Sequence, residues 1–348
     1  MPVSNIGFSR VLSCSIQTRL TAVNPIIYKA ATEGNLKALQ QYNISHDPHD
    51  EFLIVNKNTI LHICISNILV EEKFPAVGGT DHASAAKFVK DVLNMKCPSL
   101  LLKANAEDNT LLHVAARYGH ASILKVLIEH KKSQHQDLQS GVVEATTEMI
   151  GKLNKERRHY MRLYVTYNHI EVVKQLLMEV DLEFSFGANV AGETPLYLAA
   201  ERHILDLVSE ILNKFKSPAY DGPFYRTALH AAASWEENYY ISIAHFGMIQ
   251  DILGRYGRDL CKQAYQNGWT PLHMAACTGS YNVTKLLLEI DREVTYMKDA
   301  ESRTALHIAA HRNEKQVTEE IISMCLDCCE VVDNEGRNAL DLAVTTNY

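Results

Sequence analysis

The 348-residue chain lacks the features that mark several classes of protein. It has no run approaching 18 uninterrupted apolar residues, so we expect none of its segments to span a membrane. It has no surplus of positive charge, because the formal net charge is −7. An acidic balance disfavours binding that is driven by the phosphates of nucleic acid or by anionic lipid. The chain also has no glycine-rich phosphate loop, GxSxG elbow, HExxH pair or kinase signature.

The sequence also lacks a disulfide framework. Its 8 cysteines are scattered and no secretory signal precedes them, which predicts reduced thiols in the cytoplasm. Cys325, Cys328 and Cys329 have a spacing seen in metal and redox sites, but a tetrahedral site needs a second pair, and none lies nearby in sequence. His273 and Cys277 lie four residues apart and could be metal ligands, a base beside its nucleophile, or parts of a scaffold.

What the sequence does have is one recurring phrase, in forms such as "NTLLHVAARYGH", "GETPLYLAAERH", "YRTALHAAAS", "GWTPLHMAACTG" and "SRTALHIAAHRN". Its threonine recurs after 33 residues between Thr194 and Thr227, and after 34 between Thr270 and Thr304. Such a period indicates a repeat protein. A weak copy opens at Pro25, and a degenerate copy covers residues 159–177. We count about eight repeats and a terminal half repeat, with insertions near 70–84, 131–154 and 235–246.

The chemistry of one repeat predicts a turn followed by two helices. Thr270 is a good N-cap, and Pro271 suits the first helical position. Gly279 can end the helix in a left-handed conformation, and apolar residues within 283–287 form the stripe of a second helix. Asn267 and Gly268 ahead of the phrase predict a tight turn. A single pair cannot bury its apolar faces alone, so we predict an all-α solenoid of stacked helix pairs with β-turn fingers.

This pattern resembles the ankyrin repeat family, over about residues 25–345. The phrases "NHIEVVKQLL", "GETPLYLAAER", "GWTPLHMAA" and "DCCEVVDNEGRNAL" are similar to plant ankyrin proteins whose repeats precede a C-terminal membrane domain, the PGG domain. That group includes proteins of the accelerated-cell-death type, which are implicated in defence signalling. The resemblance implies a scaffold at the cytosolic face of the plasma membrane, with membrane contact only through a C-terminal segment absent from this chain. Residues 1–24 are expected to be a disordered leader and 25–348 the repeat array.

One histidine position recurs in the phrase, at His62, His113, His230, His273 and His307. These residues lie a repeat height or more apart, too far to share one metal ion. The resemblance implies instead that each histidine forms local hydrogen bonds that brace the turn and the start of the helix. Since repeats account for the chain and no catalytic motif is present, we expect no enzyme, cofactor, metal or small-molecule substrate.

Function is expected at two positions of the repeat, the residue before the threonine and the two residues after Ala-Ala. Trp, Tyr and Arg, the usual hot-spot types of interfaces, gather there. The residues predicted to bind protein partners are Arg117, Tyr118, Tyr167, Arg202, Arg226, Trp235, Trp269, Arg303, His311 and Arg312. They could equally be ordinary solvated turn residues, and Trp235 could have its own packing within an insertion. The alternative functions are a soluble adapter for a ubiquitin ligase and a His/Cys metal-dependent enzyme.

Overall fold

The computed structural model describes residues 25–45, 53–54, 57–68, 82–95, 98–134, 149–151, 154, 169–179, 186–235 and 242–346. The chain divides into two compact units, Met1–Val180 and Asp181–Tyr348, which we call the first and the second unit.

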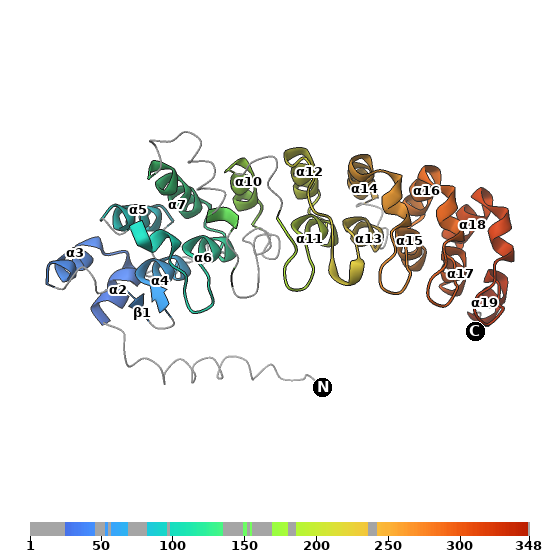
Figure 1. Ribbon diagram of the computed structural model, residues 1–348, viewed down its shortest axis with the longest axis horizontal. Helices are drawn as coiled ribbons and strands as arrows, with labels where there is room; N and C mark the ends of the chain where they lie inside the picture. Colours follow the sequence, from blue (N-terminus) through green and yellow to red (C-terminus); the bar gives the residue numbers. More distant parts are fainter. Residues whose placement is uncertain are drawn as a thin grey trace, which may run out of the picture. The chain divides into compact units, whose positions relative to one another are not determined.

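The first unit is built from helix pairs (Figure 1). The pairs are α2 (Pro25–Glu33) with α3 (Leu36–Ser45), α4 (Ile60–Ser66) with α5 (His82–Asn94), and α6 (Leu111–Arg117) with α7 (Ala121–Ser133). The 3₁₀ helix η2 (Pro98–Leu102) lies between α5 and α6 in the chain, and α10 (Ile170–Glu179) follows α7. The first helices of the pairs contact one another in the order α2, α4, α6, and the second helices form another row, α3, α5, α7, α10. Strands β1 (Leu53–Ile54) and β2 (Asn58–Thr59) pair antiparallel, with Leu53 opposite Thr59.

The second unit repeats this arrangement with greater regularity (Figure 1). Its pairs are α11 (Pro195–Glu201) and α12 (Leu205–Lys214), α13 (Ala228–Ala233) and α14 (Ser242–Tyr256), α15 (Pro271–Thr278) and α16 (Tyr281–Ile290), and α17 (Ala305–His311) and α18 (Lys315–Met324), with α19 (Ala339–Thr346) after them. The 3₁₀ helices are η3 (Pro223–Tyr225), η4 (Arg258–Lys262), η5 (Arg292–Tyr296) and η6 (Leu326–Glu330). The inner row is α11, α13, α15, α17, α19, and the outer row is α12, α14, α16, α18.

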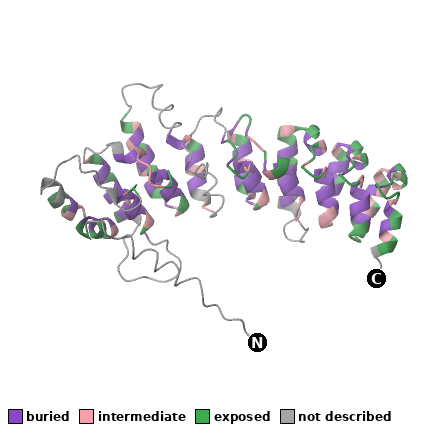
Figure 2. Cartoon of the chain, turned by 60° about the horizontal axis from the view of Figure 1, so that its bottom comes forward, coloured by how far each residue is buried: buried purple, intermediate pink, exposed green. Residues whose placement is uncertain are grey.

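Packing rather than local propensity holds these helices. The inner helices have only six to eight residues, too short to be stable alone in water. Leu272, Ala275 and Ala276 of α15 are fully buried, and the small alanines let the next inner helix approach closely. In Figure 2 the helices are coloured largely as buried, and the exposed residues lie mainly at helix ends and in the segments between helices. As predicted, Gly279 ends α15 in the left-handed conformation, with φ 70°.

The predicted all-α stack of helix pairs and turn fingers is confirmed. The leader at 1–24, most of the predicted insertions, and the first half of the degenerate copy lie outside the described residues. Helices α5, α7 and α14 nevertheless reach into the edges of the predicted insertions, at His82, Ser133 and Ser242. Within the described part of the chain, no helix is long and apolar enough to cross a membrane.

Candidate protein-binding surface

The turn that precedes each inner helix, here called a finger, has a recurring backbone. The residue two positions before the capping threonine, or before Asn338 in the last repeat, has a positive φ in each described finger. These residues are Lys57, Asp108, Gly192, Tyr225, Gly268, Ser302 and Gly336. The finger closes by a backbone hydrogen bond, such as Asp299 N to Arg303 O at 2.9 Å. In that finger the Asp299 Oδ1 atom also accepts from the backbone N–H groups of Glu301 and Arg303, so the side chain fixes the turn.

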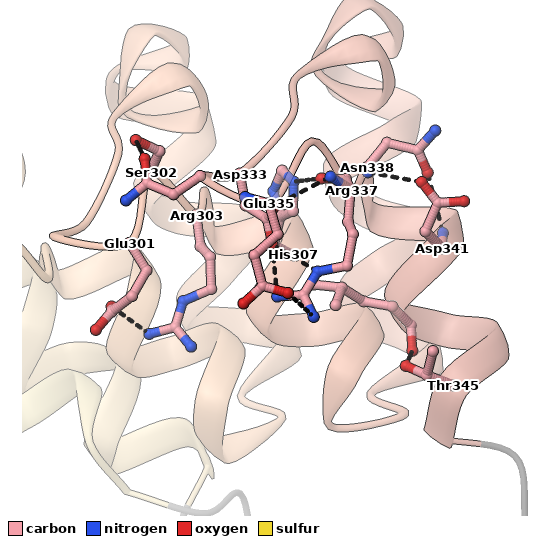
Figure 3. Close-up of polar contacts among 12 residues, drawn as sticks. Glu301, Ser302, Arg303, His307, Asp333, Glu335, Arg337, Asn338, Asp341 and Thr345 are labelled. Atoms are coloured by element: carbon pink, nitrogen blue, oxygen red, sulfur yellow. Dashed lines mark hydrogen bonds and ion pairs between the residues drawn. The ribbon is translucent and has the colours of Figure 1, made fainter.

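Arg303 and Arg337 are held inside their own fingers by an ion pair. Arg303 donates from Nε and Nη2 to Asp299 Oδ2 at 2.9 and 2.7 Å, and Arg337 makes the same bidentate contact with Asp333 at 3.0 and 2.8 Å. Figure 3 shows this second finger, together with the contact between Arg337 and Glu335. Burial alone would raise the pKa of Asp299, but the hydrogen bonds from Arg303 outweigh it and lower that pKa below its ordinary value.

The recurring histidine links two repeats. The Nδ1 atom of His307 accepts from the Thr304 N–H at 3.2 Å, so the proton of the neutral ring lies on Nε2, which donates to the Arg337 carbonyl oxygen at 3.2 Å. The same contact to the next finger joins His62 to Asn109, His230 to Trp269, and His273 to Arg303 at 2.9, 3.0 and 3.1 Å. The expected local bracing is confirmed, and the bond to the next finger is an addition that the sequence did not reveal.

Burial shapes the protonation of these histidines. Desolvation lowers the pKa of His62, His273 and His307, and lowers that of His230 to about 4. The lowered pKa keeps the ring neutral, and the bond from the threonine N–H requires that state, because a proton on Nδ1 would abolish its acceptor.

Trp269, predicted to touch a partner, is half-buried and joined to the following finger. Its indole Nε1 donates to Asp299 Oδ2 at 3.1 Å, and its ring stacks on His273 with centroids 6.2 Å apart. The finger of Trp269 starts with Tyr265, whereas the next finger starts with Asp299. The indole N–H therefore bonds to the aspartate of the next finger, since its own finger has none at that position. The side chain therefore already has an internal role.

Arg226 and Trp235 are also half-buried and also make contacts within the second unit. The Arg226 guanidinium lies over the Tyr265 ring, 5.2 Å from its centroid. The Trp235 ring lies against His203, and its backbone oxygen accepts a hydrogen bond from the Ser280 hydroxyl. These contacts pack the repeats together.

The residues after Ala-Ala reach further into solvent. Arg117 at the end of α6 is exposed, and Tyr118 beside it stacks on His120 with centroids 6.1 Å apart. In the second unit, Arg202, His311 and Arg312 are exposed at the ends of inner helices. Arg312 Nη2 lies 3.3 Å from Cys277 Sγ. Tyr167 lies outside the described residues.

The side chains that build the fingers were missed by sequence reasoning. They stand five residues before the capping position and include Asn105, Asn189, Asp299 and Asp333. Their recurrence as Asp or Asn at one position of the repeat was the available signal. Such residues favour turns because the side-chain oxygen accepts from the backbone that follows.

The cysteines of "CLDCC" belong to η6 and the residue before it. Cys328 is buried, and burial raises the pKa of its thiol to about 12, so it stays protonated and unreactive at neutral pH. The Cys325 thiol lies 2.8 Å from the Tyr296 hydroxyl. Across the described residues, no group of three His, Cys, Asp or Glu side chains could hold a metal ion.

Comparison with known proteins agrees with this geometry. Residues 241–322 match the family model for ankyrin repeats in three copies, and residues 107–134 match that for a single ankyrin repeat. The chain contains ankyrin repeats. It is also 29% identical over 152 residues to the nuclear factor NF-kappa-B p105 subunit of Gallus gallus, a match that covers 42% of this chain and 14% of that protein. Ankyrin repeats indicate a scaffold for protein–protein interaction.

Proposed function

We propose that this chain is the non-catalytic, protein-binding part of a membrane-associated signalling protein, of the plant defence type that its repeat phrases resemble. The observation that carries the binding role is the row of exposed Arg202, His311 and Arg312 at the ends of inner helices. Arginine is enriched among the residues that dominate binding energy. The membrane and defence context is supported by the resemblance of the repeat phrases.

Hydrogen bonds join successive fingers of the scaffold that carries this row, which favours binding. Each finger is bonded to the next, through Ala300 N to Asn267 O at 3.0 Å and Asn334 N to Glu301 O at 3.1 Å. The histidine bonds join the same fingers a second time. A surface that is already ordered loses little conformational entropy when a partner docks, so more of the contact energy remains as affinity.

Affinity purification of the full-length product from its own cells tests the binding role. The variant R202E/H311E/R312E should capture at least about ten-fold less of each partner than the wild type does, because losing a hot spot typically weakens binding by that much. The matched control is R258E/R292E, which reverses two exposed arginines in η4 and η5, outside this row. Equal capture by all three proteins, with equal melting temperatures, would contradict the proposal.

Membrane fractionation of the full-length product tests the context separately. The proposal expects the product and its partner to sediment together with membranes. A soluble product that co-purifies with a ubiquitin ligase would instead establish the adapter function.

A further inference from the structure

Two aromatic side chains stand in solvent at the tip of one finger of the second unit. Phe224 is 70% exposed and Tyr225 is 81% exposed, the highest value among the large hydrophobic residues that the structure describes. They belong to the finger Gly222–Arg226, which closes through Gly222 N to Arg226 O. Large apolar side chains exposed together usually mark a surface that binds something.

The backbone of this tip is unusual for such side chains. Tyr225 has φ 67° at the position where Gly192, Gly268 and Gly336 stand in other fingers. Phe224 before it also has a positive φ, 58°, although Glu301 at the matching place in another described finger does not. Bulky residues rarely adopt this left-handed conformation, because Cβ crowds the backbone. Folding would be served better by glycine, so the aromatic pair needs an explanation outside folding.

The finger that precedes this one adds another exposed apolar side chain. The neighbouring finger lies in contact, since a Cβ added to Gly192 would be 3.5 Å from Gly222 O, and that finger exposes Val190. We call Val190, Phe224 and Tyr225 the aromatic finger patch. The cation beside it, Arg226, lies over the Tyr265 ring.

The last two fingers, 299–303 and 333–337, differ in chemistry. Their tips carry Glu301 and Glu335, which pair with the arginines of their own fingers. A charged residue of a partner placed directly on the Phe224 and Tyr225 rings would lose its hydration without an ion pair in return, because the charges of this finger, Asp221 and Arg226, stand at its base. An anionic membrane is disfavoured as well, because Asp221 is exposed at the base of the same finger.

We propose that Phe224 and Tyr225 anchor an uncharged, apolar segment of a partner protein. The proposal rests on the proposed function, since it names the chemistry of the segment that the scaffold binds. Tyrosine and phenylalanine offer large contact areas with few rotatable bonds, so they bind at low entropic cost. The left-handed backbone of Phe224 and Tyr225 places both side chains in solvent before the partner arrives.

The test compares the whole chain with F224N/Y225G. Asparagine and glycine accept a positive φ, so this variant removes the apolar surface without straining the fold. The control E301A/S302G changes the matching positions of the finger 299–303. The probe is a random peptide library displayed on phage, selected against the wild-type chain. Selected peptides should be rich in apolar residues and poor in charge, and synthetic copies should bind F224N/Y225G at least about ten-fold more weakly, but the control as tightly as the wild type.

Other outcomes would overturn the anchor. If the selected peptides bind F224N/Y225G and the wild type equally, the anchor proposal is wrong. The scaffold function would still stand, because the affinity purification tests it independently. Selected peptides that are strongly acidic or basic would overturn the apolar partner. Flotation of the wild type, but not of F224N/Y225G, with phosphatidylcholine vesicles would replace the protein partner with a membrane surface.

Discussion

Two repeats of the second unit solve one structural problem with different side chains. In the repeat that starts at Thr304, His307 accepts from the threonine N–H and donates to the next finger. In the repeat that starts at Thr194, the same position holds Tyr197, which is fully buried and whose hydroxyl donates to Glu201 at 3.2 Å. In that repeat Thr194 makes the joint to the next finger, because its hydroxyl donates to the backbone carbonyl oxygen of Asp221 at 2.7 Å.

The tyrosine requires space that the histidine does not. A Cβ at Gly222 would lie 2.2 Å from the Tyr197 ring, so glycine at the start of that finger is a steric requirement. The finger thereby lacks the Asp or Asn that fixes other turns, such as Asn189 in the preceding finger. The repeat thus accepts either a hydrogen-bonding histidine or a packed tyrosine ring at this position, provided that the finger that follows changes with it.

The largest expected effect comes from removing a histidine joint. His273→Ala deletes a buried ring, removes one of the two donors to the Arg303 carbonyl and leaves the Thr270 N–H without its ring acceptor. A buried cavity and lost hydrogen bonds together should lower the free energy of unfolding by about 4 kcal/mol. Urea unfolding measures this, with His311→Ala on the exposed end of α17 as control, expected within about 0.5 kcal/mol of the wild type. A loss for His273→Ala as small as that of the control would show that the bond to the next finger contributes nothing.

The next effect tests the steric half of the comparison. Gly222→Ala should cost about 3 kcal/mol, because the new methyl group meets the Tyr197 ring and neither fully buried group can move freely. Tyr197→His in the same chain should restore most of this loss, since the smaller ring can adopt the arrangement of His307. Unfolding of the single and double variants measures both. A double variant no more stable than Gly222→Ala would mean that the two joints are not interchangeable.

Acidification should destabilise the repeats that bury a histidine, because it charges the ring and removes the acceptor of the threonine N–H. The pKa of His230 is about 4 in the folded chain because of burial, below the ordinary value of 6.5. The unfolded chain therefore binds more protons between these values, so this stabilisation is complete above about pH 6.5 and is lost as pH falls toward 4. Between pH 7 and 5 the loss from His230 alone is about 2 kcal/mol. Denaturation at the two pH values measures it, and His230→Asn should show a smaller difference than the wild type.

The sequence predicts the local structure of each repeat better than it predicts the contacts between repeats. The helix pairs and the left-handed Gly279 follow from the spacing of Thr, Leu, His and Ala-Ala, because these are local preferences repeated many times. The bracing histidines follow from the resemblance to ankyrin repeats. The bond from His273 to Arg303 does not follow, since it joins atoms 30 residues apart.

The surface was harder to predict for the same reason. Trp269 and Arg303 occupy positions typical of exposed turns, and only the three-dimensional position of Asp299 reveals that it holds both. The exposure of Tyr225 also depends on a backbone conformation that its side chain disfavours. Sequence patterns indicate the backbone conformations that residues favour locally. A locally unfavourable conformation that the surrounding structure stabilises is therefore missed.

The smallest predicted effect separates the two joints most directly. Tyr197→Phe removes the hydroxyl that donates to Glu201 and keeps the ring that packs under Gly222. Because Glu201 is half-exposed and can bind water instead, the free energy of unfolding should fall by only about 0.5 kcal/mol. Urea unfolding of Tyr197→Phe and His273→Ala, measured side by side, compares the two losses of free energy of unfolding. If Tyr197→Phe cost as much as the histidine change, the tyrosine would act mainly through its hydroxyl and not through the packing of its ring.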